Sequence, residues 1–205
     1  KLYQVGEHDI TVFYGEHTYT FKVSVKRSTF DAVAFPESSV FTYDGEVHGA
    51  TVAVSTLPEG YTLETATSDD TATDVTTEAV AATCDTLVIR NAAGEDVTSE
   101  LNIKYVDGTI VITPAALTIV TESASKVYDG SALTAAGEIT GFVNGETATF
   151  TVTGSQTAVG ESDNSYSLVW DGTAKASNYT ITETIGKLNV TEYAEEIVVT
   201  TTGGE

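Results

Sequence analysis

The stretch ESSVFTYDG at residues 37–45 recurs in altered form as ESASKVYDG at residues 122–130. The offset is 122 − 37 = 85 positions, and Glu, Ser, Tyr, Asp and Gly fall in register. Both copies end in Tyr-Asp-Gly, where the Asp side chain bonds backbone two residues on and Gly supplies a positive φ. A short strand pattern that ends twice in the same turn predicts two related β modules.

The two related segments also end alike. NIKY at residues 102–105 leads through Gly108 to a second apolar run, and NYTI at residues 178–181 leads through Gly186 to another. Each ending predicts a β-hairpin that closes on its glycine. We therefore place the first module at residues 30–114 and the second at residues 115–192.

The two flanks are shorter than a module. Residues 1–29 contain the pattern of one hairpin, with a Gly-Glu-His turn near its middle. Because an isolated hairpin is marginal in water, we interpret this segment as the end of a preceding domain. We interpret residues 193–205 as a linker or as the first strand of a following repeat.

Alternation by two dominates the rest of the chain and predicts an antiparallel all-β protein. Tyr19, Phe21, Val23 and Val25 share one face of a strand, for example, while polar residues occupy the other. Short helical turns are expected only at 97–101 and 174–177. The links near residues 27–31 and 113–117 contain no Gly/Ser run, so we expect an elongated, semi-rigid array.

Composition excludes several classes of function. The chain of 205 residues carries 30 acidic and 9 basic residues, a formal net charge of −21, which disfavours nucleic acids and anionic lipid surfaces. Its single cysteine forms no intramolecular disulfide and no multi-thiolate zinc site. No apolar run is long enough to cross a bilayer, so we expect no membrane insertion by this segment.

Three parts of the chain resemble known families. The Tyr-Asp-Gly turns, the pattern at residues 178–190, and DVTSELNI at residues 96–103 followed by GTIVI resemble MBG/YDG-type repeats of bacterial cell-surface, adhesin-like proteins. The N-terminal hairpin resembles the last strands of a bacterial immunoglobulin-like domain. The resemblance implies tandem, β-grasp-like modules without catalytic residues. A small β-sandwich is the alternative fold, and we expect no enzymatic activity.

The two turns are the most distinctive candidate sites. We interpret them as structural, because each module needs the same turn; the alternative is a pair of sugar-contacting loops. The turn residues are Tyr43, Asp44, Gly45, Tyr128, Asp129 and Gly130.

Metal and thiol chemistry have weak support in the sequence. The acidic clusters around Asp69, Asp70 and Asp74 and around Glu161 and Asp163 lack the spacing of known calcium loops. A weak Ca²⁺ site at a domain junction is the alternative to solvated charge. We interpret His8, His17 and His48 as solvated and Cys84 as a half-buried strand residue, so no cofactor is expected.

These observations predict a structural stalk or spacer on the outside of a bacterium, wall-attached or secreted, that projects a distal domain. Its partners would be neighbouring domains of the same protein. The alternative is an adhesin-type module that binds a host glycan or matrix protein through exposed aromatic residues. The candidates for that role are Trp170, Tyr166 and Tyr179, although for Trp170 a buried core position is favoured over an exposed one.

Overall fold

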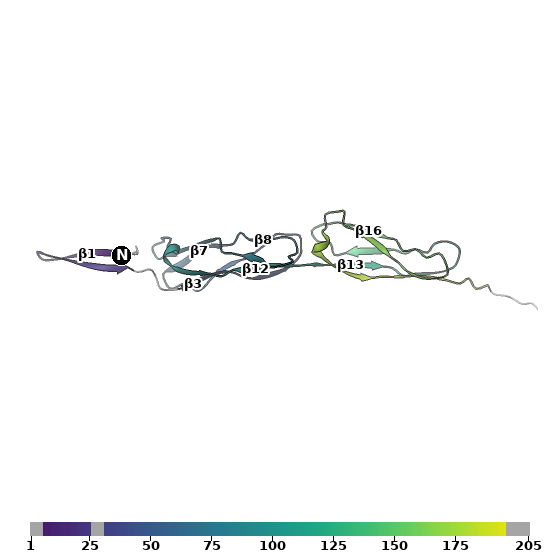
Figure 1. The fold of residues 1–205 in the computed structure, drawn as a ribbon, viewed down its shortest axis with the longest axis horizontal. Coiled ribbons are helices and arrows are strands. Elements are labelled where there is room, and N and C mark those ends of the chain that lie inside the picture. The colour runs from purple at the N-terminus through teal and green to yellow at the C-terminus, as the bar shows by residue number, and fades with distance from the viewer. Residues whose placement is uncertain (1–5, 26–30, 196–205) are drawn as a thin grey trace, which may run out of the picture. The chain divides into compact units, whose positions relative to one another are not determined.

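The computed structural model describes residues 6–25 and 31–195 (Figure 1). Within these ranges the secondary structure consists of twenty β-strands and two three-residue 3-10 turns, η1 (Thr98–Glu100) and η2 (Ala176–Asn178). The prediction of an all-β protein built of small β-rich modules is confirmed. The predicted features at residues 1–5, most of the link at 27–31, and any strand at 196–205 lie outside the described residues.

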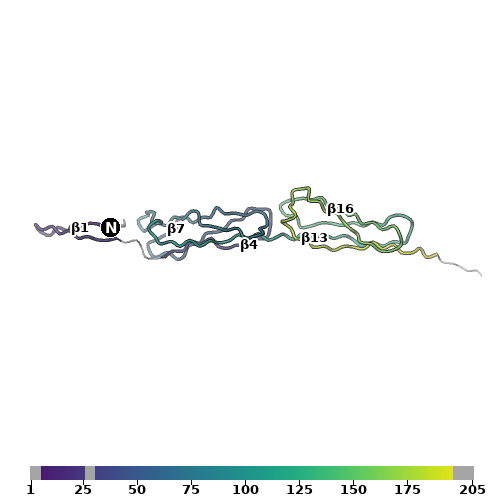
Figure 2. The backbone as a smooth tube through the Cα atoms, viewed as in Figure 1, coloured from purple at the N-terminus to yellow at the C-terminus, as the bar shows by residue number. Residues whose placement is uncertain are grey.

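The chain divides into two compact units. Unit 1 comprises Lys1–Phe41 with Val47–Ile112, and unit 2 comprises Thr42–Glu46 with Thr113–Glu205. The short loop at residues 42–46, which contains the first Tyr-Asp-Gly turn, is therefore part of unit 2. Figure 2 traces the backbone through both units.

Unit 1 contains two three-stranded sheets and two strand pairs. The first sheet has the order β11-β3-β6, made of β3 (Asp31–Pro36), β6 (Val52–Val54) and β11 (Asn102–Tyr105). The second has the order β4-β12-β9, made of β4 (Ser39–Thr42), β9 (Val80–Ala82) and β12 (Gly108–Thr113). The pairs are β7 (Tyr61–Thr67) with β10 (Thr86–Asn91) and β5 (His48–Gly49) with β8 (Thr71–Ala72).

Unit 2 repeats this connectivity. One sheet has the order β15-β13-β19, made of β13 (Ala115–Thr121), β15 (Gly137–Thr140) and β19 (Tyr179–Thr184). The other has the order β14-β20-β17, made of β14 (Ala124–Val127), β17 (Gly160–Asp163) and β20 (Lys187–Thr191). The remaining pair is β16 (Thr149–Val152) with β18 (Tyr166–Val169). Strands β13, β14 and β15 thus correspond to β3, β4 and β6, and so on along the chain to β20 and β12.

Two expectations about strand pairing are wrong. The sheets are mixed rather than antiparallel, because β3 pairs with β11, β13 with β19, and β14 with β20 in parallel. Moreover, β11 and β12 belong to different sheets, as do β19 and β20, so neither module ends in a hairpin. The two-residue links carry the chain from one sheet to the other.

The glycines at these links serve close packing rather than a turn. A Cβ at Gly108 would collide with the carbonyl of Pro36, and a Cβ at Gly186 would collide with the carbonyl of Glu122. Neither glycine has a positive φ. Both glycines are buried where the chain changes sheets, so the absence of a side chain is what each site requires.

The core of each unit follows the alternation of its strands. In β13 the buried residues are Ala115, Leu117, Ile119 and Thr121. Leu188 and Val190 of β20 complete this core in unit 2, and Ala32, Ala34, Ile110 and Ile112 occupy the equivalent strands in unit 1. Each fully buried Leu or Ile contributes about 1.5–3 kcal/mol of hydrophobic stabilisation.

The N-terminal hairpin is an amphipathic ribbon. Strands β1 (Gly6–Tyr14) and β2 (His17–Val25) are paired along their whole length, with Ile10 opposite Phe21 and Val12 opposite Tyr19. Directly opposed residues share a face, so this face is apolar and the other carries Thr, Lys and acidic residues. Its similarity to an immunoglobulin-like domain remains a prediction.

Candidate functional site

The most highly organised polar cluster of unit 2 is centred on one carboxylate. Glu146 lies in the loop between β15 and β16, and each of its oxygens accepts a hydrogen bond from a tyrosine hydroxyl. Tyr43 donates to Oε1 at 2.5 Å and Tyr179 donates to Oε2 at 2.6 Å. We call Tyr43, Glu146 and Tyr179 the tyrosine clasp. Charge-assisted bonds of this kind are stronger than those between neutral groups.

Two tight turns place the members of the clasp. Gly45 has φ 81°, and the Asp44 carboxylate accepts from the Glu46 N–H at 2.9 Å, which fixes the turn that follows Tyr43. Across the cluster, Asn144 and Gly145 have φ 48° and 69°, and the Glu146 N–H donates to the Val143 carbonyl at 2.9 Å. Two successive positive φ values are typical of a type I′ turn, for which Asn-Gly is a preferred sequence.

Aromatic rings surround the clasp. Tyr43 packs edge-on against Tyr179 with ring centroids 5.7 Å apart, and Phe142 packs edge-on against Tyr179 at 5.5 Å. Trp170 stacks on Tyr179 at 6.0 Å. Tyr43 and Tyr179 are 4% and 7% exposed, whereas Phe142 and Trp170 are half-buried. Pairs in these geometries contribute about 0.5–1.5 kcal/mol beyond the area that they bury.

The first Tyr-Asp-Gly turn also fits closely against the Asn-Gly turn. A Cβ at Gly45 would lie 2.8 Å from the Cβ of Asn144, so glycine is required by space as well as by φ. The Asn144 Nδ2 donates to the Gly45 carbonyl at 3.4 Å. The two turns therefore contact each other through backbone and short side chains.

The electrostatics of the clasp favour a structural hydrogen bond between Tyr179 and Glu146 over a catalytic role for Tyr179. Burial and the bond to Glu146 raise the pKa of Tyr179 to about 12. The Val143 N–H, which donates to the Tyr179 oxygen at 3.2 Å, acts in the opposite direction. A phenol with so high a pKa stays protonated near neutral pH, so it remains a donor to the carboxylate and is a weak nucleophile.

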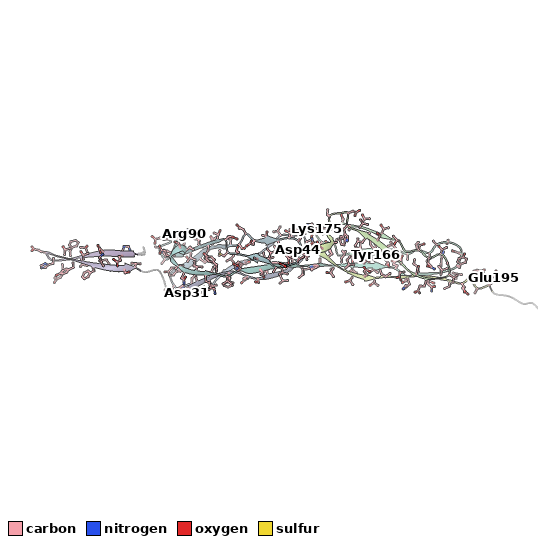
Figure 3. The ribbon with its side chains drawn as sticks, in the orientation of Figure 1. Asp31, Asp44, Arg90, Tyr166, Lys175 and Glu195 are labelled. Atoms are coloured by element: carbon pink, nitrogen blue, oxygen red, sulfur yellow. The ribbon has the colours of Figure 1, made fainter. Side chains whose placement is uncertain are left out.

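The aromatic residues proposed as ligand contacts are engaged within unit 2. Tyr166, labelled in Figure 3, donates to Glu183 Oε1 at 2.6 Å and packs against Phe150 with centroids 5.5 Å apart. Burial and Glu183 raise the pKa of Tyr166 to about 12. The expectation that Tyr179 is exposed is wrong, because its ring fills the space between Tyr43, Phe142 and Trp170. A ligand-binding role for the three remains a prediction.

The second Tyr-Asp-Gly turn has the same geometry but a different environment. Gly130 has φ 79°, and Asp129 Oδ1 accepts from the Ser131 N–H at 2.9 Å and from Lys126 Nζ at 2.7 Å. The Lys126 ammonium and the Ser131 donors hold the pKa of Asp129 well below its usual range. Tyr128 is 45% exposed.

Carboxylates of both acidic clusters have hydrogen-bond or ion-pair partners within their own unit. Asp70 Oδ2 accepts from the Thr83 N–H at 2.7 Å and from its hydroxyl at 2.8 Å, which lowers the pKa of Asp70. Lys187 Nζ lies 2.6 Å from Asp163 and 3.8 Å from Glu161. In the part of the chain that the structure describes, no three His, Cys, Asp or Glu side chains are grouped as metal ligands. The weak calcium site remains a prediction.

The other candidate side chains belong to unit 1 and are not members of the clasp. His48 stacks on Phe41 with ring centroids 4.1 Å apart, and His17 lies near Tyr19. Burial and Asp85 raise the pKa of the half-buried Cys84 thiol, which opposes formation of a reactive thiolate. Among residues 6–25 and 31–195, no helix has the length and apolar character needed to span a bilayer.

Sequence reasoning missed three participants in the cluster, Phe142, Asn144 and Glu146. The Asn144-Gly145 turn was recognisable as a hairpin-type signal, but nothing in the local sequence links Glu146 to tyrosines 103 and 33 positions away. The partners of a carboxylate in a β protein depend on which strand ends meet.

The fold defines unit 2 as a small all-β module. Residues 117–189 match the family model described as MBG domain (YGX type). MBG domains are a non-catalytic repeat family typical of bacterial surface proteins. No curated protein and no solved structure matches the chain.

Proposed function

We propose that the chain is a structural stalk or spacer segment of a bacterial surface protein, with its modules joined into an extended array. The observation that carries this proposal is the repetition of one strand connectivity in two units, one of which matches the MBG-domain family model over residues 117–189. Repeat modules whose stability comes from each unit and its neighbours need no active site to serve as a spacer.

The use of polar and aromatic groups supports a structural role. The hydroxyls of Tyr43 and Tyr179 donate to Glu146, and the hydroxyl of Tyr166 donates to Glu183. Trp170 stacks within the same unit. The net charge of −21 keeps such a segment solvated and repels other copies, as an extracellular, wall-attached or secreted stalk requires.

Small-angle X-ray scattering of the full chain tests the spacer function. A compact globule of this length has a radius of gyration near ~17 Å. We expect a value well above that in calcium and the same value after chelation. A compact particle, or one whose dimensions change on chelation, would contradict a metal-independent spacer.

The competing function is an adhesin-type module that binds a host glycan or matrix protein. The half-buried Trp170 is the residue on which this function depends most directly. It predicts saturable glycan binding that is lost in Trp170→Phe while unit 2 stays folded. A spacer predicts no glycan binding by the original chain or by Trp170→Phe. Tyr105→Phe, which changes an exposed aromatic residue of unit 1, is the control.

A further inference from the structure

The two Tyr-Asp-Gly turns share one geometry and differ in what covers them. Tyr43 is 4% exposed and Tyr128 is 45% exposed. A Cβ at Gly45 would strike Asn144, whereas a Cβ at Gly130 would meet nothing within 4 Å. The first turn is covered by the Asn-Gly turn and the aromatic rings of unit 2, and the second turn lacks such a cover in the described chain.

Backbone hydrogen bonds hold the two turns at equivalent positions of the repeated fold. The Tyr43 N–H donates to the Thr113 carbonyl at 2.8 Å, and the Tyr128 N–H donates to the Thr191 carbonyl at 2.9 Å. Thr113 ends β12 and Thr191 ends β20, which are equivalent strands. Each turn is thus fixed to the last residue of an equivalent strand, β12 for the first turn and β20 for the second.

We propose that the second turn, Tyr128 to Gly130, is a docking surface for a further copy of the unit 2 module. In that complex Tyr128 takes the position that Tyr43 takes in unit 2. Its hydroxyl donates to the copy's equivalent of Glu146, and its ring packs edge-on against the equivalent of Tyr179. Gly130 admits the equivalent of Asn144.

The residues of the second turn favour a copy of the unit 2 module as the partner over a module of the unit 1 type. The partner must supply a carboxylate after a type I′ turn and a tyrosine directly after a 3-10 turn. Unit 2 has both features, whereas in unit 1 Leu101 directly follows η1 and belongs to an aliphatic cluster with Ile89 and Val97, against which Leu57 and Tyr61 pack. A module of the unit 1 type therefore lacks the groups that would hold Tyr128.

A fusion protein tests the proposal in the whole chain. Residues 1–191 are joined directly to a second copy of residues 114–205, which reproduces the Thr-Pro junction that precedes unit 2. The appended copy carries Tyr128→Phe, so that one Tyr128 remains to report. Tyrosines are nitrated with tetranitromethane, and the rate at each is followed by mass spectrometry.

We expect the nitration rate of Tyr128 to fall roughly tenfold in the fusion, in line with the exposures of 45% and 4% for the two tyrosines. Tyr43, buried in both proteins, is the internal control. Glu146→Ala in the appended copy should restore much of the Tyr128 rate and leave that of Tyr43 unchanged.

Nitration of Tyr128 at the same rate in the fusion and the original chain would overturn the proposal. An appended copy that fails to fold by circular dichroism also counts against it, because the fusion supplies equivalents of every residue that unit 2 uses. The proposal rests on the proposed array, yet the two fail separately. An exposed Tyr128 in an extended particle removes only the docking surface, and a buried Tyr128 in a compact particle removes only the spacer.

Discussion

Unit 1 and unit 2 fix the same corner of the fold with different chemistry. In unit 1 the carboxylate of Asp70, which lies between β7 and β8, accepts from the N–H and the hydroxyl of Thr83, which lies between β9 and β10. Between β17 and β18 of unit 2, the fully buried Asn164 donates from Nδ2 to the carbonyls of Glu122 and Ala136 at 3.0 and 3.1 Å.

The difference shows how one connectivity accommodates two kinds of polar anchor. A neutral amide can be buried completely once its donors are satisfied, whereas a carboxylate stays near solvent because removing its charge from water is costly. The stability of the polar anchor in unit 1 therefore depends on pH, whereas that of the anchor in unit 2 depends on close packing.

The largest effect is expected from removing the buried amide. Asn164→Ala removes both hydrogen bonds that its Nδ2 donates, so the Glu122 carbonyl loses this donor while the Ala136 carbonyl keeps the Glu122 N–H. We expect a loss of about 1–3 kcal/mol in the unfolding free energy of unit 2. The only tryptophan of the chain, Trp170, lies in unit 2, so its fluorescence in a urea titration reports this loss. Asn189→Ala, at an exposed position of β20, is the control, and equal midpoints for the two variants would show that the amide is not an anchor.

A smaller effect is expected from the clasp. Tyr43→Phe removes one hydrogen bond to a charged group and should destabilise unit 2 by about 1–2 kcal/mol. The matched variant is Tyr128→Phe, which should leave the urea midpoint unchanged because that tyrosine is exposed. The same shift from both variants would mean that the clasp contributes no specific stability.

The carboxylate corner predicts a local response to acid. The pKa of Asp70 lies below its ordinary value of 3.8 because Thr83 donates to the charged form. Its contribution to stability is therefore present above pH about 4 and is lost as the pH falls through the lower folded value. The Thr83 amide resonance should titrate with a midpoint below 3.8, and Asp70→Asn should abolish the transition, whereas the Asn164 side-chain resonances should show no transition of their own. A Thr83 midpoint at or above 3.8 would refute the assignment.

The smallest effect concerns alkali. The pKa of Tyr166 and that of Tyr179 are each raised to about 12. For such groups the neutral form is favoured by folding, so their stabilisation is present below pH about 10 and declines toward pH 12. A tyrosinate absorbance titration should lose one ionisation near pH 12 in Tyr179→Phe, and an unchanged curve would place Tyr179 outside the clasp.

Much of the architecture was accessible from the sequence. The offset of 85 between residues 37 and 122 equals the offset between β4 at 39–42 and β14 at 124–127. Alternation predicts strands, and Tyr-Asp-Gly predicts turns with positive φ, because both signals are local. Gly45 and Gly130 both have positive φ.

The errors arose where local signals are ambiguous. Asp107-Gly108 between two apolar runs is typical of a hairpin, but here the link joins strands of separate sheets. Alternation predicts which residues share a face of a strand. It does not predict which strand pairs with it, or whether the pairing is parallel or antiparallel. The clasp depends on both, so its two tyrosines could be named from the sequence but not brought together, and Glu146 was missed.

The parallel pairing of early and late strands determines how unit 2 responds to force. Because β13 is parallel to β19 and β14 to β20, a pull on the two ends of the unit slides these strands along each other. The hydrogen bonds of each pair are then loaded together, in shear, which slows forced unfolding. In the β1–β2 hairpin, where Gly6 faces Val25, the same pull separates one pair of residues at a time. A single-molecule pulling experiment should therefore give a high-force event for unit 2 and a low-force event for the hairpin.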